Sequence, residues 1–415
     1  MTRAARTWLP LLFLLIGAGF LACVGFAACV GFAACAEWSP PVSPTSTGAA
    51  PAQTPQARGT NLATITGIAV EPTGLPATRP PTVAPAETAA PRPQIPPTLP
   101  PEAFSPSYGD RFGVTGSDLD ITAAHDLGLP FTIYADWNVR ANPLRPDGVV
   151  FYQMIRLRDG RIHTPMEDID AALEGNPAAV WLIGNEPDVV VQDNTTPQRY
   201  AELYHELYMR IKGQDPAAAV AIAGVSQSTP LRRAYLDTVL DTYEERYGQR
   251  MPIDIWNVHA FTLREEAGQW GIGIPPGMGD ELATLYEIQD HDDLDIFARN
   301  LIDFREWMAR KGYSDRPLLV SEFGFLMPHD FGFPPEDIAA FLEGAFDFLL
   351  TARNDTGFAP DGGRLVQWWL WFIVSGPPDD EYAATFLYDR QSGQLTDLGE
   401  AYANFVEENA PADAP

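Results

Sequence analysis

From about residue 108 onward, short runs of apolar, β-prone residues alternate with longer stretches in which apolar residues recur every three or four positions. The first pattern is typical of strands buried on both faces, and the second of amphipathic helices. The pattern predicts eight strands, near residues 111–114, 131–137, 151–157, 179–185, 218–225, 253–261, 317–323 and 365–373. Strands that alternate with helices in this way indicate a parallel sheet.

Helix starts lie between the predicted strands. Thr-Pro pairs at 164–165, 196–197 and 229–230, and Pro334-Pro335, place proline at the beginning of a helix, where its missing N–H costs nothing. Apolar residues over 294–308 recur every three or four positions, and a last helix is predicted over about 398–407. With a helix expected after every strand, the sequence predicts fold class α/β and a single (β/α)8 TIM barrel. A doubly wound open sheet is the alternative, but the chain lacks the glycine-rich phosphate turns common in that class.

The first 36 residues differ from the rest. Arg3 and Arg6 precede an apolar run that carries no charge before Glu37. This is the pattern of a signal peptide, and the run is also long enough for a membrane anchor. Small residues precede each of the three cysteines, which resembles a bacterial lipoprotein signal. Lipidation, cleavage before Glu37 and an uncleaved anchor stay open, and each predicts an extracytoplasmic protein, held at the cell surface or secreted. The cysteines are Cys23, Cys29 and Cys35.

A linker is expected to separate this segment from the barrel. Residues 40–101 contain 16 prolines, and no aromatic residue occurs between Trp38 and Phe104. Such a composition buries too little apolar surface to fold, so we expect residues 37–105 to be disordered. The catalytic domain is then predicted over 106–409, followed by a flexible tail over 410–415.

Charge and cysteine content exclude several functions. The chain carries 27 basic and 55 acidic side chains, which gives a net charge of −28 and argues against nucleic-acid partners and against membrane binding other than through the N-terminal anchor. We expect the protein to bind no cofactor and no metal, and to be a monomer. Five of the six histidines show no metal-ligand spacing and are predicted to lie at the surface. They are His125, His163, His205, His291 and His329.

Two glutamates stand where the chemistry of a barrel is expected. Glu186 ends the fourth predicted strand in Gly184-Asn185-Glu186-Pro187, and Glu322 ends the seventh in Ser321-Glu322-Phe323-Gly324. A charged group directly after a buried strand is costly and therefore needs a reason. Glycosidic bond cleavage supplies one, because it needs a protonated acid and an ionised carboxylate. Asn185 is positioned to bind a sugar hydroxyl.

These two segments resemble the glycoside hydrolases of clan A, over roughly residues 108–409. The resemblance implies that Glu186 is the acid/base, that Glu322 is the nucleophile and that the configuration of the sugar is retained. Family 5, family 39 and the small β-1,3-glucanase-like cores are all similar, and the motifs do not separate them. The expected substrate is a β-linked oligo- or polysaccharide, with the sugar, the linkage and endo or exo action undetermined.

Further residues are predicted to support the site. Alternation along the sixth strand places His259 on the inward face, toward the glutamates. Trp371 and Trp369 on the eighth strand and Trp137 at the end of the second are predicted to contact the sugar, and a tryptophan on the eighth strand does so in clan A. Arg140 is either a donor to the nucleophile, as in some clan A families, or a surface residue.

Two other expectations follow. The long stretch from Thr262 to Asp290 is predicted to form a wall or lid at the active face, because loops of this length are usually functional. A non-catalytic carbohydrate-binding or scaffold protein on a degenerate barrel is the alternative to an enzyme.

Overall fold

The computed structural model describes residues 94–328 and 331–412. The predicted signal or anchor segment, nearly all of the predicted linker and the end of the tail lie outside these residues. Within the described part of the chain, no helix is both long enough and apolar enough to cross a membrane.

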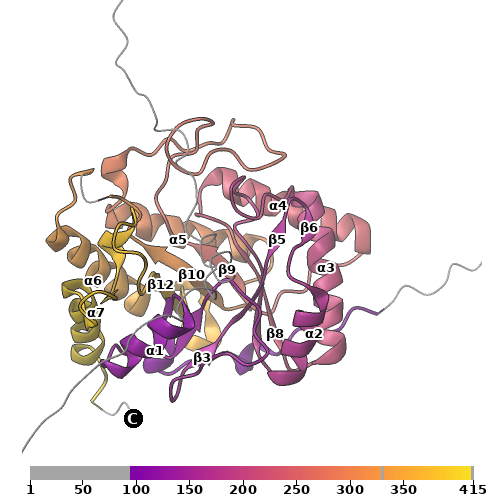
Figure 1. Cartoon of the computed structure of the whole chain (residues 1–415). Coiled ribbons are helices and arrows are strands. Elements are labelled where there is room, and N and C mark those ends of the chain that lie inside the picture. Colours follow the sequence, from indigo (N-terminus) through magenta and orange to yellow (C-terminus); the bar gives the residue numbers. More distant parts are fainter. Residues whose placement is uncertain (1–93, 329–330, 413–415) are drawn as a thin grey trace, which may run out of the picture. The chain divides into compact units, whose positions relative to one another are not determined.

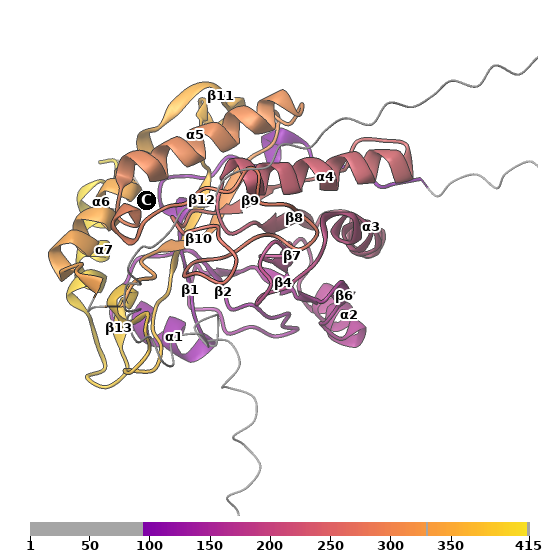
Figure 2. The ribbon, with the colours of Figure 1, turned by 90° about the horizontal axis from the view of Figure 1, so that it is seen from above.

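Eight parallel strands, with β3 and β4 counted as one, form a closed barrel (Figures 1 and 2). One sheet has the order β3-β2-β1-β12-β10-β9, and a second has the order β4-β7-β8. Only Tyr152 separates β3 from β4, so these two form one strand that joins the sheets, while bridges such as Ala221 to Ile255 join β8 to β9. The barrel is therefore closed, which confirms the predicted fold and excludes the open sheet. The strands are β1 (Phe112–Thr115), β2 (Ile133–Ala135), β3 (Val150–Phe151), β4 (Gln153–Ile155), β7 (Val180–Asn185), β8 (Ala219–Gly224), β9 (Trp256–His259), β10 (Leu318–Gly324) and β12 (Trp368–Phe372).

The described residues form seven α-helices. Figure 2 shows that the helices lie around the outside of the strands. Their N-termini agree with the sequence signals: Pro197 and Pro230 open α3 and α4, and the Thr229 side chain caps α4 by accepting from Arg232 N. The helices are α1 (Asp118–Asp126), α2 (Met166–Gly175), α3 (Pro197–Gln214), α4 (Pro230–Tyr247), α5 (Leu294–Arg310), α6 (Pro335–Thr351) and α7 (Asp397–Glu408). Short hairpins, β5 (Leu157–Arg158) with β6 (Arg161–Ile162) and β13 (Tyr388–Asp389) with β14 (Gln394–Leu395), and the strand β11 (Arg353–Phe358) complete the fold.

One predicted helix is missing. The chain between β2 and β3 runs as a loop, although a helix was expected after every strand. This interval contains Pro143, Pro146 and Gly148, each of which interrupts a helix, and it is too short to hold a full helix between them.

The apolar core has two layers. Side chains that point into the barrel form one cluster, which includes Leu182, Leu319 and Leu370. Side chains that point outward from the same strands pack under the helices and form a larger cluster, which includes Trp181 and Val320. Neighbouring residues on one strand therefore belong to different layers, as the two-residue repeat of a strand requires.

The end of the predicted linker belongs to the barrel instead. Residues 95–104, here called the strap, cross the base of the barrel, where the strands begin. Phe104 is buried against Trp368 with ring centroids 6.2 Å apart, and Leu99 packs against the same interior cluster. Leu99 N also donates to Asp254 Oδ1. The boundary at residue 105 was wrong by about ten residues, because a proline-rich composition concealed two apolar side chains that close the barrel.

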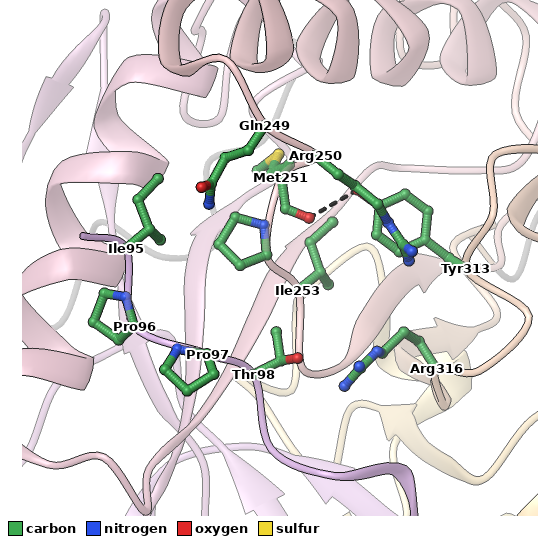
Figure 3. A pocket seen from close by; sticks show the side chains of 11 residues that line it. Ile95, Pro96, Pro97, Thr98, Gln249, Arg250, Met251, Ile253, Tyr313 and Arg316 are labelled. Carbon is green, nitrogen blue, oxygen red and sulfur yellow. Dashed lines mark hydrogen bonds between the residues drawn. The ribbon is translucent and has the colours of Figure 1, made fainter. Parts of the chain in front are cut away.

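A cavity of about 220 Å³ lies beside the strap (Figure 3). Ile95 to Thr98 form one wall, and the segments before β9 and β10 form the others, including Arg250, Tyr313 and Arg316. Arg250 lies over the Tyr313 ring, 3.6 Å from its centroid, and Arg316 donates to Leu99 O. The hydrogen bond from Arg316 holds the strap against the segment before β10, on the side of the barrel where the strands begin.

Candidate active site

Glu186 stands at the carboxyl end of β7, where the backbone leaves its extended conformation. Gly184 and Glu186 both have positive φ, at 94° and 45°. The turn is held by the buried Asp193, whose Oδ2 accepts from Asn185 N at 2.7 Å and from Leu157 N at 2.9 Å. Glu186 itself is only 7% exposed. A left-handed conformation in a non-glycine residue is uncommon, and its presence here is consistent with a functional side chain.

Glu322 reaches the inside of the barrel because β10 contains a bulge. The pairing register of β10 shifts after Val320 toward both of its neighbours, β9 and β12. Asn257 of β9 accepts from Ser321 N at 3.2 Å and so fixes the irregular residue. Simple alternation from the inward Leu319 would turn Glu322 outward; the bulge reverses this and aims Glu322 inward, where it is 5% exposed.

His259 joins the two glutamates. Its Nδ1 lies 2.9 Å from Glu186 Oε1 and 3.7 Å from Glu322 Oε2, and the residue is fully buried. Its ring rests against Gly224 of β8, where an added Cβ would come within 2.3 Å of His259 Cδ2. Alternation along the strand predicted this inward placement of His259 next to the glutamates.

Trp137 provides the closest hydrogen bond to Glu322. Its Nε1 donates to Glu322 Oε1 at 2.7 Å, and the residue has a positive φ of 60°. Arg140, the alternative donor considered from the sequence, pairs with Asp136 and with Asp118 instead. Arg140 is therefore not a donor to Glu322; it lies at the surface, with 36% of its side chain exposed and held by these two ion pairs. The indole N–H of Trp137 makes the hydrogen bond to Glu322 that was expected from Arg140 as one alternative.

The two tryptophans proposed on the eighth strand do not face the site. Trp369 and Trp371 are both 0% exposed and lie in the outer core layer, where Trp371 contacts Phe323 and Phe346 and donates to Thr385 O. Assigning them to the sugar was wrong, because alternation turns Trp368 and Leu370 into the barrel and their neighbours toward the helices.

Phe372, which the sequence analysis missed, lies at the end of β12 on the side of the glutamates. Its ring contacts Trp137, Phe261 and Tyr382 at centroid distances of 5.9, 6.0 and 5.9 Å. These four side chains, here called the aromatic wall, come from the ends of three strands and from the loop after β12. Counting forward from the inward-facing Leu370 by alternation would have indicated Phe372, had the strand register been known.

Burial and charge change the acidity of the site. Burial raises the pKa of Glu322, while the nearby His259 lowers it, the charge of Glu186 raises it and the hydrogen bond from Trp137 lowers it; the net direction is upward. Burial lowers the pKa of His259, but the negative charge of Glu322 and the contact with Glu186 outweigh this and raise it overall.

A buried ionic network supports the loops around Glu186. Arg232 of α4 is fully buried and pairs with Asp188 at 3.0 Å and with Glu265 at 2.9 Å. It also donates to Gly273 O, and Glu265 accepts from Thr284 N. The network therefore ties the long loop after β9, shown at the top of Figure 1, to the loop that follows Glu186.

His291 connects the loops after β9 and β10. Its Nδ1 donates to Thr262 O at 3.0 Å, and its Nε2 accepts from Leu326 N at 2.9 Å. The predicted surface position of His291 was wrong: it is buried between Phe325 and Phe333. Its spacing in the sequence carries no signal for this, because both of its hydrogen-bond partners are backbone atoms.

Among the described residues, one set of side chains offers enough ligand atoms for a cation. One oxygen each of Glu186 and Glu322 and a ring nitrogen of His259 lie within 4.8 Å of one another. Each of these groups already has a hydrogen-bond partner in the site, and an acid–base pair needs the same arrangement.

Comparison with known proteins identifies similar folds. No protein family model and no curated protein matches the chain. An exo-β-1,3-glucanase of family GH128 from Blastomyces gilchristii has 19% identity over 72% of this chain and 99% of its own, with a TM-score of 0.49. A GH128 endo-β-1,3-glucanase from Amycolatopsis mediterranei has 16% identity over 71% and 98%, with a TM-score of 0.48. A GH128 oligosaccharide-binding protein from Cryptococcus neoformans has 15% identity over 74% and 98%, with a TM-score of 0.47. These likenesses concern the fold and do not decide between catalysis and binding.

Proposed function

We propose that the protein is a retaining glycoside hydrolase that cleaves a β-linked glycan. The observation that carries the proposal is the pair of buried glutamates, which bring one oxygen each to within 4.8 Å at the carboxyl ends of β7 and β10. Retaining enzymes hold their two carboxyl groups about 5–5.5 Å apart, whereas inverting enzymes leave about 6.5–9.5 Å for a water molecule. The short separation supports the retaining mechanism.

The two glutamates have different partners, which suits different roles. Burial raises the pKa of Glu322, but the hydrogen bond that it accepts from the indole N–H of Trp137 opposes this and favours the ionised form that attacks the anomeric carbon. Glu186 contacts His259, a group that can exchange protons near neutral pH. We assign Glu322 as the nucleophile and Glu186 as the acid/base, which first protonates the leaving oxygen and then activates water.

Substrate binding is proposed for two further groups, the aromatic wall and Asn185. The aromatic wall offers apolar ring surface beside Glu322, and sugar rings present C–H faces that pack on such surfaces. Asn185 is buried, and no group in the described residues donates to its Oδ1. A sugar hydroxyl next to the reacting carbon would supply that donor.

The test uses two variants with opposite chemical rescue. Glu186→Ala should still be glycosylated by aryl glycosides with good leaving groups, and azide should restore turnover with retained configuration. Glu322→Ala should lose nearly all activity, and azide should give the inverted product. Glu206→Ala, on the exposed face of α3, is the matched control. If the wild-type protein is active and both variants keep more than about a tenth of that activity, the assignment is wrong.

The binding-protein alternative has its own outcome. A panel of β-1,3-glucans, xylans and mannans should show hydrolysis of at least one glycan and thereby also name the sugar. Binding of a glycan with no hydrolysis under any condition would favour the non-catalytic protein. Activity should be unchanged by a chelator, since the proposed mechanism uses only side chains of this chain.

We also propose that the barrel is held at an extracytoplasmic surface by a lipid on one of the three N-terminal cysteines. The small residues before Cys23, Cys29 and Cys35 support this proposal. Mass spectrometry of the mature N-terminus should find a diacylglyceryl cysteine. An unmodified N-terminus at Glu37 would show free secretion instead, and a chain that still contains Arg3 and Arg6 would show an uncleaved anchor.

A further inference from the structure

The carboxylate of Glu322 is held by a neutral donor. Its Oε1 accepts from Trp137 Nε1 at 2.7 Å, and its Oε2 faces His259 Nδ1 at 3.7 Å. The other charged groups that act on it are Glu186 on β7 and Arg156, which follows β4. Arg156 is engaged elsewhere, with its Nε 2.8 Å from Asp193 Oδ1. Among the described residues, the indole is thus the group that makes the shortest contact with Glu322.

The turn that carries Trp137 is built to aim the indole. Trp137 has a φ of 60°, a conformation that bulky residues adopt rarely and at a cost. Asp136, just before it, accepts from Asn138 N at 3.2 Å and from the guanidinium of Arg140, while Asn138 Nδ2 donates back to Asp136 O at 2.7 Å. These polar contacts therefore hold Trp137 in an unfavourable backbone conformation, which directs its indole N–H to Glu322.

We propose that Trp137 is the positioning residue for Glu322, fixing the orientation of the carboxylate through a neutral hydrogen bond. This inference rests on the proposed role of Glu322 as the nucleophile. An indole N–H can only donate, so it binds one oxygen of the carboxylate and fixes the plane of the group. When Glu322 forms a bond to the sugar, its negative charge disappears. A neutral donor such as the indole loses less attraction to Glu322 in that step than a cation in the same position would.

The first test does not depend on activity. In a ¹H–¹⁵N spectrum, the indole resonance of Trp137, assigned by its loss in Trp137→Phe, should shift with pH as Glu322 titrates. In Glu322→Gln this pH-dependent shift should disappear. An indole resonance that does not respond to pH, or that titrates equally in Glu322→Gln, would overturn the proposal. These measurements decide the role of Trp137 even if the wild-type protein hydrolyses no glycan.

The second test compares two tryptophan-to-phenylalanine variants. Trp137→Phe keeps an aromatic ring but loses the donor that favours the ionised carboxylate, so the acid limb of kcat/KM should move up by about one pH unit. The kcat should fall about 10- to 100-fold with a smaller change in KM, since a misplaced nucleophile affects the reaction more than binding. An unmoved acid limb in an active Trp137→Phe would contradict the proposal.

Trp307→Phe is the matched control. Trp307 Nε1 also donates to a carboxylate, Asp237 Oδ1 at 2.8 Å, but on the helix layer and away from the glutamates. This variant removes the same kind of hydrogen bond, and both its pH profile and its kcat should equal those of the wild type. A shifted acid limb in Trp307→Phe as well would mean that the effect is general to lost indole hydrogen bonds, and would overturn a specific role for Trp137.

Discussion

His259 and Glu186 are joined by a 2.9 Å contact between Nδ1 and Oε1, although they lie 73 positions apart in the sequence and both are buried. Burial lowers the pKa of His259, but the charge of Glu322 and the contact with Glu186 raise it overall. A protonated imidazole between two carboxylates is thus favoured in the folded protein. Above the folded pKa this attraction is lost.

The first prediction compares the wild type with His259→Asn, which keeps a donor but does not titrate. Because the folded pKa of His259 is raised, its contribution is fully present below the unfolded value of about 6.5 and is lost as the pH rises through the folded value. The difference in unfolding free energy should therefore shrink above pH ~6.5, by up to about 1.4 kcal/mol per pH unit. Chemical denaturation from pH 5.5 to 9 measures it, and a constant or growing difference would refute it.

His291 should show the opposite dependence. Burial lowers its pKa to about 4, and Nε2 must stay unprotonated to accept from Leu326 N. Its stabilising contribution is therefore present above the unfolded pKa and is lost as the pH falls from about 6.5 toward the folded value. His291→Phe suits the aromatic neighbours but leaves Leu326 N unpaired, which should cost about 1–3 kcal/mol near pH 7. Thermal unfolding should show that this cost diminishes toward pH 4.

The strap should be needed for stability. Removing residues 94–105 exposes the base of the barrel, and Phe104→Ala alone should cost about 3–5 kcal/mol, because Phe104 is buried against Trp368. Pro97→Ala, at an exposed position in the same segment, is the control and should change little. Equal urea midpoints for the chains that start at 94 and at 106 would show that the strap does not contribute.

Replacing Arg232 should lower the free energy of unfolding more than replacing an exposed arginine. Arg232→Met leaves Asp188 and Glu265 as unpaired buried charges, and breaking such a network typically costs about 3–5 kcal/mol. Arg310→Met, which breaks an exposed pair with Glu306, should cost less than about 1 kcal/mol. Denaturant unfolding of both variants measures the contrast. A cost for Arg232→Met no larger than the control would mean that water reaches the network.

Sequence patterns predicted the barrel well because its strands are apolar runs and four of its helices, α2, α3, α4 and α6, begin at Thr-Pro or Pro-Pro pairs. They placed Glu186, Glu322 and His259 together because parallel strands bring their carboxyl ends to one rim. They did not predict the bulge at Ser321, which depends on Asn257, a residue from another strand. The resemblance to clan A glycoside hydrolases identified Glu322 as a site residue, whereas simple alternation along the strand would have turned its side chain out of the barrel.

The tryptophan assignments failed for a related reason. Trp368, Trp369 and Trp371 form a run in which every residue is apolar, so composition cannot tell the inward face from the outward one. Only the pairing of β12 with β1 and β10 fixes that choice. The strap was missed because one leucine and one phenylalanine contribute little to the average composition of a proline-rich segment, although they close the barrel.

Gly224 restricts the site through the space it leaves for His259, although it carries no side chain of its own. A Cβ at this position would lie 2.3 Å from His259 Cδ2 and 2.5 Å from its Nε2, so even alanine must displace the imidazole from between the glutamates. In a complete substitution library selected for hydrolysis, position 224 should tolerate as little as the glutamates themselves. Evolution of a new acid–base arrangement in this barrel would therefore have to begin with His259, since while the histidine keeps its place, position 224 stays glycine.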